Sequence, residues 1–271
     1  MKDKKISIQF TVLTFLIAYF VAGALIIAGQ FGYTVYNWVN TFQQFIMNIP
    51  FSIYILSPAI ASYIVLKKNN RITGFNEWLK TVFYVKNNIF VYLFVIGVLV
   101  LYFGVHMAVS NRAEIVLPFY TFLLSLPGGI IIGGMEEAGW MYVLQPKLDK
   151  KYGFLFASIF VGVIWVFWHI PLFFIPGTNH CGGFINFWMF NIQVMSFSFV
   201  RGAVYKISEK GHVFVFVLFH TMFNAVSPIF GTTTMTWSGT VVANSALILL
   251  SIATVLIYEK WNKAKSSAAT V

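Results

Sequence analysis

Long stretches without a charged residue constrain the fold of this 271-residue chain more than any other feature. Only 10% of its residues are charged, whereas soluble domains carry about 25%. A membrane-spanning helix needs about 20 apolar residues, so each long stretch accommodates two helices and each short one accommodates one. The sequence therefore predicts an all-α, polytopic membrane protein, a single domain over 1–271 with about eight transmembrane helices. The charge-free stretches are 6–66, 87–111, 115–135, 152–200 and 211–258.

The expected spans differ in how regular they should be. Pro50 and Pro58 should kink the second span. The segment Phe75–Phe83 has apolar residues at helical spacing and predicts a short amphipathic helix at the membrane surface. The first apolar run is too long for a signal peptide, so we expect it to be retained as a span. The spans are expected at 8–29, 45–66, 89–107, from 117, 154–175, 184–205, 212–230 and 240–258.

The lysines and arginines predict the orientation of the chain in the membrane. The net charge is +10, and 17 of the 18 cations, Arg201 among them, fall in segments that lie on one side if eight spans alternate. Arg112 alone falls on the other side. Cytoplasmic loops carry such an excess, so both termini are expected in the cytoplasm. The basic surplus then indicates contact with anionic lipids rather than with nucleic acid.

Two adjacent carboxylates, Glu136 and Glu137, stand inside an apolar segment. A charge in hydrocarbon costs several kcal/mol, so an ionisable residue there indicates a functional site. His169 lies in the fifth expected span, and His220 and Asn224 lie one helical turn apart in the seventh, on one face. We expect Glu136, His169, His220 and Asn224 to converge on one cavity, reached from the cytoplasm or through a gap between helices.

A glutamate and two histidines in a dry cavity have three possible roles: activating water, relaying protons or ions, and satisfying each other in a polar core. The water could be activated directly or through zinc held by Glu136, His169 and His220. One cysteine, Cys181, excludes a multi-cysteine zinc site. It lies beside His180 in an expected outer loop, where both are interpreted as loop residues.

Three motifs in order resemble the type II CAAX prenyl endopeptidases, also called the CAAX protease and bacteriocin-processing (Abi) family of intramembrane proteases. They are the glutamate pair with Gly139 and Trp140, the segment from Trp165 through His169, and His220 with Asn224. They cover about 115–230. The resemblance, to the bacterial branch, implies an intramembrane endopeptidase of the bacterial cytoplasmic membrane. It implies a peptide or membrane-protein substrate, with bacteriocin processing or immunity among the roles.

The resemblance also implies roles for individual residues. Glu136 would be the base that activates water together with His169, and His220 with Asn224 would stabilise the oxyanion. Glu137, Trp140 and Trp165 would support the site or bind substrate. No metal is required in this scheme, although zinc stays open.

One departure from the family concerns Met141. The first motif is usually EExxxR, and Met141 stands at the arginine position. Glu137 would then stay protonated, find another cation or bind a positive group of the substrate. On this basis we expect Glu137→Gln to be milder than Glu136→Gln, and Met141→Arg to preserve or raise activity. The missing arginine also favours reduced activity or a non-proteolytic scaffold or regulator. A small transporter with Glu136 as its proton carrier is a weaker alternative, because the sequence has no inverted repeat.

Overall fold

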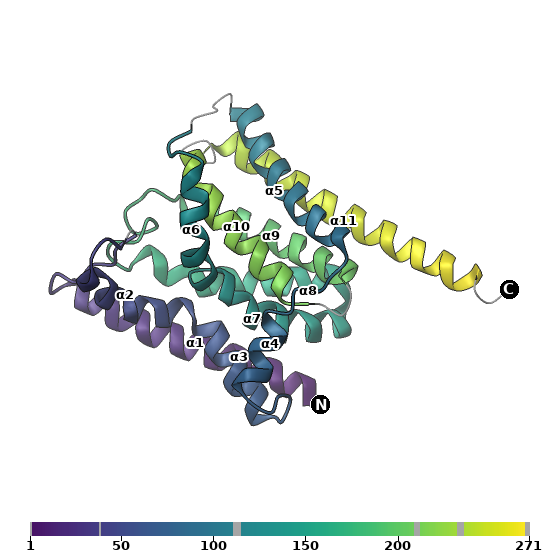
Figure 1. The fold of residues 1–271 in the computed structure, drawn as a ribbon, viewed down its shortest axis with the longest axis horizontal. Coiled ribbons are helices and arrows are strands. Elements are labelled where there is room, and N and C mark those ends of the chain that lie inside the picture. Colours follow the sequence, from purple (N-terminus) through teal and green to yellow (C-terminus); the bar gives the residue numbers. More distant parts are fainter. Residues whose placement is uncertain (1, 38, 111–114, 209–211, 232–235, 269–271) are drawn as a thin grey trace.

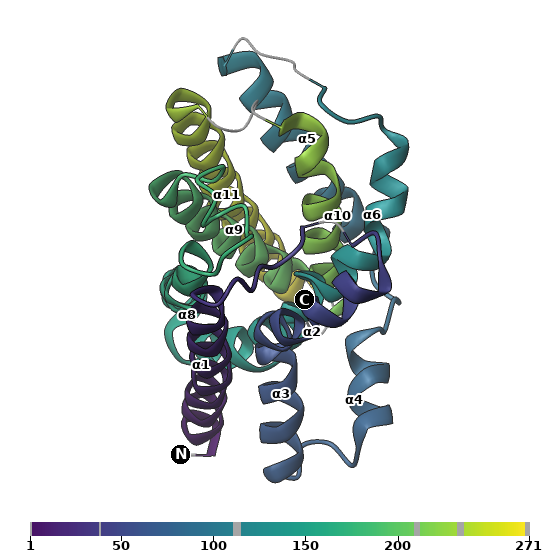
Figure 2. The same ribbon diagram turned by 90° about the vertical axis from the view of Figure 1, so that its left-hand side faces the viewer.

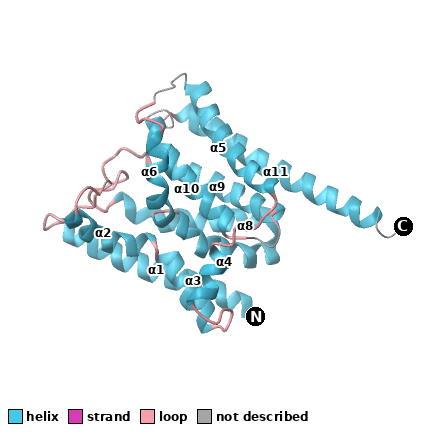
Figure 3. Cartoon of the chain, in the orientation of Figure 1, coloured by secondary structure: helices cyan, strands magenta, loops and turns pink. Residues whose placement is uncertain are grey.

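The computed structural model describes every residue except 1, 38, 111–114, 209–211, 232–235 and 269–271. All regular elements in the described part of the chain are helices, which confirms the all-α prediction (Figure 3). The longer elements are α1 (Lys2–Gly29), α2 (Phe42–Ile55), α3 (Ser57–Lys68), α4 (Phe75–Val82), α5 (Ile89–Ser110), α6 (Tyr120–Ile131), α8 (Gln145–His169), α9 (Phe187–Ile207), α10 (Phe214–Phe230) and α11 (Trp237–Ala268). Four short elements complete the order: η1 (Gly134–Glu136), α7 (Glu137–Gly139), η2 (Trp140–Leu144) and η3 (Ile170–Phe173).

The helices form two groups that meet at the segment from α6 to α8 (Figure 1). In the first group α1 packs against α2 and α3. In the second, α9 packs against α8 and α11, while α10 packs against α6 and α5. Figure 2 shows α1 and α3 side by side in one half of the molecule, with α5 and α11 in the other. The chain between α6 and α8 therefore lies where it can contact both groups.

Among the described residues, four helical segments are long and apolar enough to cross a membrane: 4–29, 89–110, the continuous run 120–173 and 237–265. A fifth is counted if the bent pair α2 and α3 forms one span. These segments indicate an integral membrane protein. Each of the eight expected span regions contains a helix, but α10 has only 17 residues, so length and composition do not confirm a count of eight.

Two breaks shape the helices, and the sequence indicated the first of them. The axes of α2 and α3 differ by 54°, which confirms the kink expected from Pro50 and Pro58. The break falls at Leu56, two residues before Pro58 in the first turn of α3, where a proline is well tolerated. Within α8, Gly153 has φ 76°, so its first two turns point differently from the rest.

The amphipathic segment also forms a helix, α4. Its apolar face is partly buried through Trp78 and Val82, and the Trp78 indole donates a hydrogen bond to the Ser62 hydroxyl on α3 at 3.0 Å. Helix α4 is therefore anchored to the bundle on one side.

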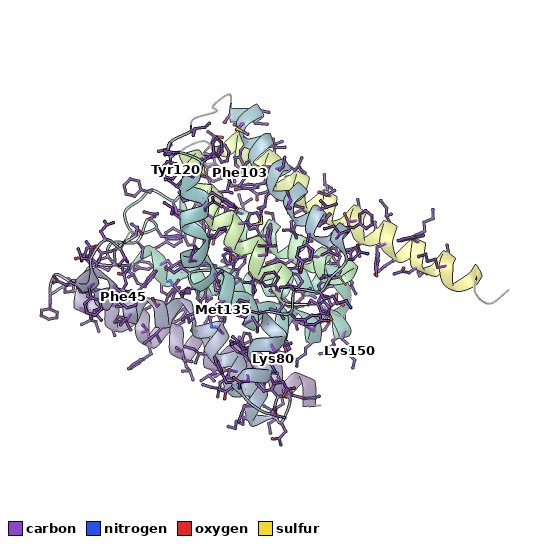
Figure 4. The ribbon with its side chains drawn as sticks, viewed as in Figure 1. Phe45, Lys80, Phe103, Tyr120, Met135 and Lys150 are labelled. Atoms are coloured by element: carbon purple, nitrogen blue, oxygen red, sulfur yellow. The ribbon has the colours of Figure 1, made fainter. Side chains whose placement is uncertain are left out.

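One of the cations expected in the cytoplasm is buried. Figure 4 places two others, Lys80 and Lys150, near the N-terminus of Figure 1, with Phe45 and Tyr120 on other sides of the molecule. Arg201 was expected among the cytoplasmic cations, and this expectation is wrong because its side chain is 1% exposed inside the bundle. A buried carboxylate partner holds it there. Arg112 and Lys210 lie outside the described residues.

Candidate active site

The glutamate pair lies in an irregular segment between two long helices. Helix α6 ends at Ile131, and Gly133 takes φ 113°, which side chains other than glycine rarely adopt. Glu136 ends the 3₁₀ turn η1, and Glu137 begins the single turn α7. The π-helix η2 follows directly, and π-helical turns often occur at functional sites. Figure 4 shows the neighbouring Met135 near the middle of the bundle.

Two glycines before the glutamates allow this segment to contact α10 closely. A Cβ atom on Gly133 would lie 2.2 Å from Asn224 Nδ2 and 2.9 Å from His220 Nε2. A Cβ on Gly134 would lie 2.5 Å from Thr221 Oγ1. The Asn224 amide donates a hydrogen bond to the Ile132 carbonyl at 3.0 Å. Backbone and α10 side chains therefore meet without intervening atoms.

Glu136 is bound by the indole of a tryptophan on α8. Trp165 Nε1 donates a hydrogen bond to Glu136 Oε2 at 2.9 Å, and Glu136 is only 3% exposed. This bond fixes one carboxylate oxygen and leaves the other free to accept a proton. Trp165 of the second motif thus contacts a carboxylate of the first directly, and its supporting role stays a prediction.

Glu137 makes two contacts through one oxygen. Its Oε1 accepts from Arg201 Nη1 at 2.7 Å and lies 3.0 Å from His220 Nδ1. The carboxylate is fully buried. Of the three possibilities left by Met141, the structure realises the second, because Arg201 on α9 is the other cation. Since a carboxylate only accepts hydrogen bonds, His220 donates from Nδ1, and its Nε2 is left for the cavity.

His169 is oriented by its own helix. Its Nδ1 lies 2.8 Å from the Trp165 carbonyl, which can only accept, so Nδ1 carries the proton. In the neutral ring Nε2 is then a proton acceptor. The ring also packs edge-on against Trp165, Trp168 and Phe190. These contacts fix the plane in which Nε2 can accept.

One cavity of about 210 Å³ brings the four expected residues together. Glu136, His169, His220 and Asn224 all line it, as does Trp165. Trp140 is absent from the lining as far as the chain is described: it is fully buried beside Phe10 and Trp168. The remaining walls are largely apolar and come from α2, α9 and α10, including Phe51, Phe190, Phe197 and Phe223.

Two loops that hydrogen bonds join contribute to the cavity lining. Asn37 comes from one loop, and Thr178, Asn179 and His180 come from the other. Val35 N donates to the Pro176 carbonyl at 2.9 Å, and Asn37 Nδ2 donates to the Gly177 carbonyl at 2.9 Å. Both loops were assigned to the outer side, and access to the cavity from the cytoplasm or through a gap between helices stays a prediction.

A metal ion is not needed to describe this donor set. No three His, Cys, Asp or Glu side chains come together in a metal-binding arrangement among the described residues. His220 Nδ1 contacts Glu137 and His169 Nδ1 contacts a backbone carbonyl, so each ring has its Nε2 left for the cavity. Zinc bound by Glu136, His169 and His220 stays a prediction, and the chemistry is derived from the side chains alone.

Two residues of the site were missed from the sequence. Arg201 was counted with the surface cations, although it lies within the expected span 184–205, where a charge calls for a buried partner. His180 was interpreted as a loop residue, yet it lines the cavity and its ring contacts Phe173 and Phe190. Burial lowers the pKa of His180 to about 4, so its ring is neutral at physiological pH. Nothing in the sequence distinguished His180 from an exposed loop residue.

Comparison with known proteins supports the resemblance that the motifs indicated. Residues 118–226 match the family described as type II CAAX prenyl endopeptidase Rce1-like. CAAX prenyl protease 2 of Methanococcus maripaludis is 20% identical over 134 residues, which are 48% of each chain. The match thus spans about half the length of this curated relative. The similarity to this family is confirmed over these residues, which include the whole glutamate, histidine and asparagine set.

Proposed function

We propose that this protein is an intramembrane endopeptidase that hydrolyses a peptide bond of a membrane-associated peptide or protein. The observation that carries the proposal is the single cavity lined by Glu136, His169, His220 and Asn224. The similarity of 118–226 to the prenyl endopeptidase family supports a protease, and the long apolar helices support its place in a membrane.

In this proposal Glu136 is the general base. Its carboxylate oxygen that Trp165 does not bind accepts a proton from water, while His169 Nε2 accepts a hydrogen bond from the second water hydrogen. The water oxygen attacks the carbonyl carbon of the substrate. Glu136 then returns the proton to the leaving nitrogen as the C–N bond breaks. A positioned acid and base of this kind contributes about 10²–10⁴-fold to a rate.

His220 and Asn224 stabilise the oxyanion of the tetrahedral intermediate. Asn224 Nδ2 has two hydrogens and uses one on the Ile132 carbonyl, which leaves one for the substrate. His220 would donate from Nε2 of a charged ring, whose Nδ1 lies 3.0 Å from Glu137 Oε1. Donors fixed before the reaction provide much of the stabilisation in acyl transfer.

Replacing Asn224 by alanine is expected to lower kcat about 10²–10³-fold, as for the loss of one oxyanion donor. KM should change little, because the donor acts mainly on the transition state. Cleavage of a peptide in proteoliposomes, measured at several substrate concentrations, separates the two constants. Asn76→Ala on the exposed face of α4 is the matched control. An unchanged kcat in Asn224→Ala would remove Asn224 from the mechanism.

The orientation expected from the cations places both termini and Lys150 in the cytoplasm and Cys181 outside. Cys181 is exposed and is the one cysteine of the sequence. A membrane-impermeant maleimide should label it in intact bacterial cells. In Cys181→Ser combined with Lys150→Cys, labelling should require permeabilised membranes. Labelling of both positions in intact cells would contradict the orientation.

Arg201 weakens the main argument for a non-proteolytic scaffold. That argument rested on Met141 in place of the motif arginine, which would leave Glu137 without a cation. The ion pair between Arg201 and Glu137 supplies one from another helix. Glu137 therefore keeps a cationic partner and still contacts His220. The proposed reaction uses this contact, because it orients His220 toward the substrate.

A further inference from the structure

The guanidinium of Arg201 contacts two side chains of the candidate active site, Glu137 and Trp165. Its Nη1 binds Glu137 Oε1 at 2.7 Å, and its Cζ lies 3.7 Å from the centre of the Trp165 ring. Its Nη2 donates to the Ser198 hydroxyl one turn earlier on α9, at 3.1 Å. Glu137 in turn contacts His220, and Trp165 in turn donates a hydrogen bond to Glu136. One cation on α9 thus contacts the two side chains that bind His220 and Glu136.

The burial of this pair argues for a role beyond stability. Both side chains are 1% exposed or less, and taking two charges out of water is costly. Within the described structure, Glu137 Oε2 and Arg201 Nε are buried without a hydrogen-bond partner, so the pair is not fully compensated. Apolar residues of similar volume often replace such pairs without loss of stability. Packing alone therefore gives no reason for Arg201 at this position.

We infer that Arg201 is a positioning residue that fixes Glu137 by an ion pair and fixes Trp165 by stacking, so that Glu136 and His220 face the cavity together. The kinetic part of this inference rests on the proposed peptidase function, while the contact with Glu137 does not. The planar guanidinium performs both tasks at once because it pairs with carboxylates along its edge and stacks on aromatic rings with its face.

Lysine and methionine at position 201 separate the two tasks. Lysine keeps a cation for Glu137 but has no planar group to stack on Trp165. Methionine removes both contacts. Lys206→Met is the matched control, because Lys206 lies on the same helix and forms an equally short ion pair with Asp149, at 2.7 Å, which does not involve the glutamate pair.

The purified full-length protein is examined in two ways. An apolar carbodiimide, dicyclohexylcarbodiimide, reacts with protonated carboxyl groups in apolar surroundings, and mass spectrometry locates the label. We expect Glu137 to be labelled in Arg201→Met, but not in the wild type, Arg201→Lys or Lys206→Met. Peptide cleavage should show kcat about 10²-fold lower in both Arg201 variants, with KM unchanged, as for a small misplacement of a catalytic group.

The outcomes distinguish this inference from the proposed function. Equal labelling of Glu137 in the wild type and in Arg201→Met would overturn the ion-pair role. A wild-type kcat in Arg201→Lys would overturn the role of stacking on Trp165. Since Arg201→Lys retains the charge, it tests the inference even if Arg201→Met does not fold. If the wild type cleaves no peptide but the labelling follows expectation, the peptidase proposal fails while the hold of Arg201 on Glu137 stands.

Discussion

Replacement of Glu136 by glutamine is expected to abolish peptide cleavage, a loss of at least the ~10²–10⁴-fold that a positioned general base contributes. An amide cannot accept the proton of the attacking water. Its oxygen can still accept the hydrogen bond that Trp165 now donates to Glu136 at 2.9 Å, so the fold should be retained. Cleavage rates in proteoliposomes, compared with thermal unfolding in detergent, separate the loss of the base from loss of structure.

The control for this experiment is Glu259→Gln, on an exposed position of α11 far along the chain from the cavity. It should cleave at the wild-type rate. A second test uses the cell in which the gene occurs. If deletion of the protein changes a phenotype and Glu136→Gln does not, the protein acts without catalysis, and a scaffold role would replace the peptidase proposal.

Replacement of Gly133 by alanine is expected to lower kcat by about 10²–10³-fold, because it disturbs both oxyanion donors. The new Cβ would lie 2.2 Å from Asn224 Nδ2 and 2.9 Å from His220 Nε2, so both side chains must move. The φ of 113° adds about 1–3 kcal/mol of backbone strain for a residue other than glycine. Steady-state kinetics and an unfolding curve measure the two effects separately.

Gly128→Ala provides the matched control, because Gly128 lies in α6 only five positions earlier and a Cβ there meets no atom within 4 Å. Its kcat and its unfolding should match those of the wild type. Equal effects of the two replacements would mean that alanine disturbs this helix in general. Full activity of Gly133→Ala would show that Asn224 and His220 do not act from the positions described.

The structure reverses what Met141 led us to expect of Glu137. Without a partner, Glu137 would tolerate glutamine better than Glu136 does. Its carboxylate instead pairs with Arg201, and breaking such a buried pair from one side costs about 3–5 kcal/mol. Met141 is itself fully buried, so a longer arginine side chain would need extra space there. It would also need a carboxylate partner, and Glu137 is already paired with Arg201. Neither the mild effect of Glu137→Gln nor a gain from Met141→Arg is expected now.

The features that could be predicted from the sequence depend on local patterns. Charge-free stretches predicted the helices, the prolines predicted the bend between α2 and α3, and apolar residues at helical spacing predicted α4. His220 and Asn224 were expected on one face because they are four residues apart, and both line the cavity. The convergence of Glu136 with His169 was predicted only as a consequence of their being rare polar groups in apolar helices.

The features that could not be predicted depend on contacts between distant segments. Arg201 and Glu137 are 64 residues apart, and no local pattern links them. The two loops that contribute to the cavity lining are joined by hydrogen bonds between residues about 140 positions apart, such as Asn37 with the Gly177 carbonyl. Periodicity carries no information on such contacts.

The π-helical turn η2 affects how the glutamate pair before it and helix α8 after it are oriented relative to each other. A π-turn contains one residue more than an α-helical turn, and each residue of an α-helix adds about 100° of rotation. The chain after Leu144 is therefore out of phase with the chain before Trp140 by about that angle. Deleting one residue in this turn would restore a regular helix and rotate either the glutamate pair or the start of α8 away from its partners. Residue spacing within this segment thus helps to determine how the glutamate pair and the start of α8 face each other.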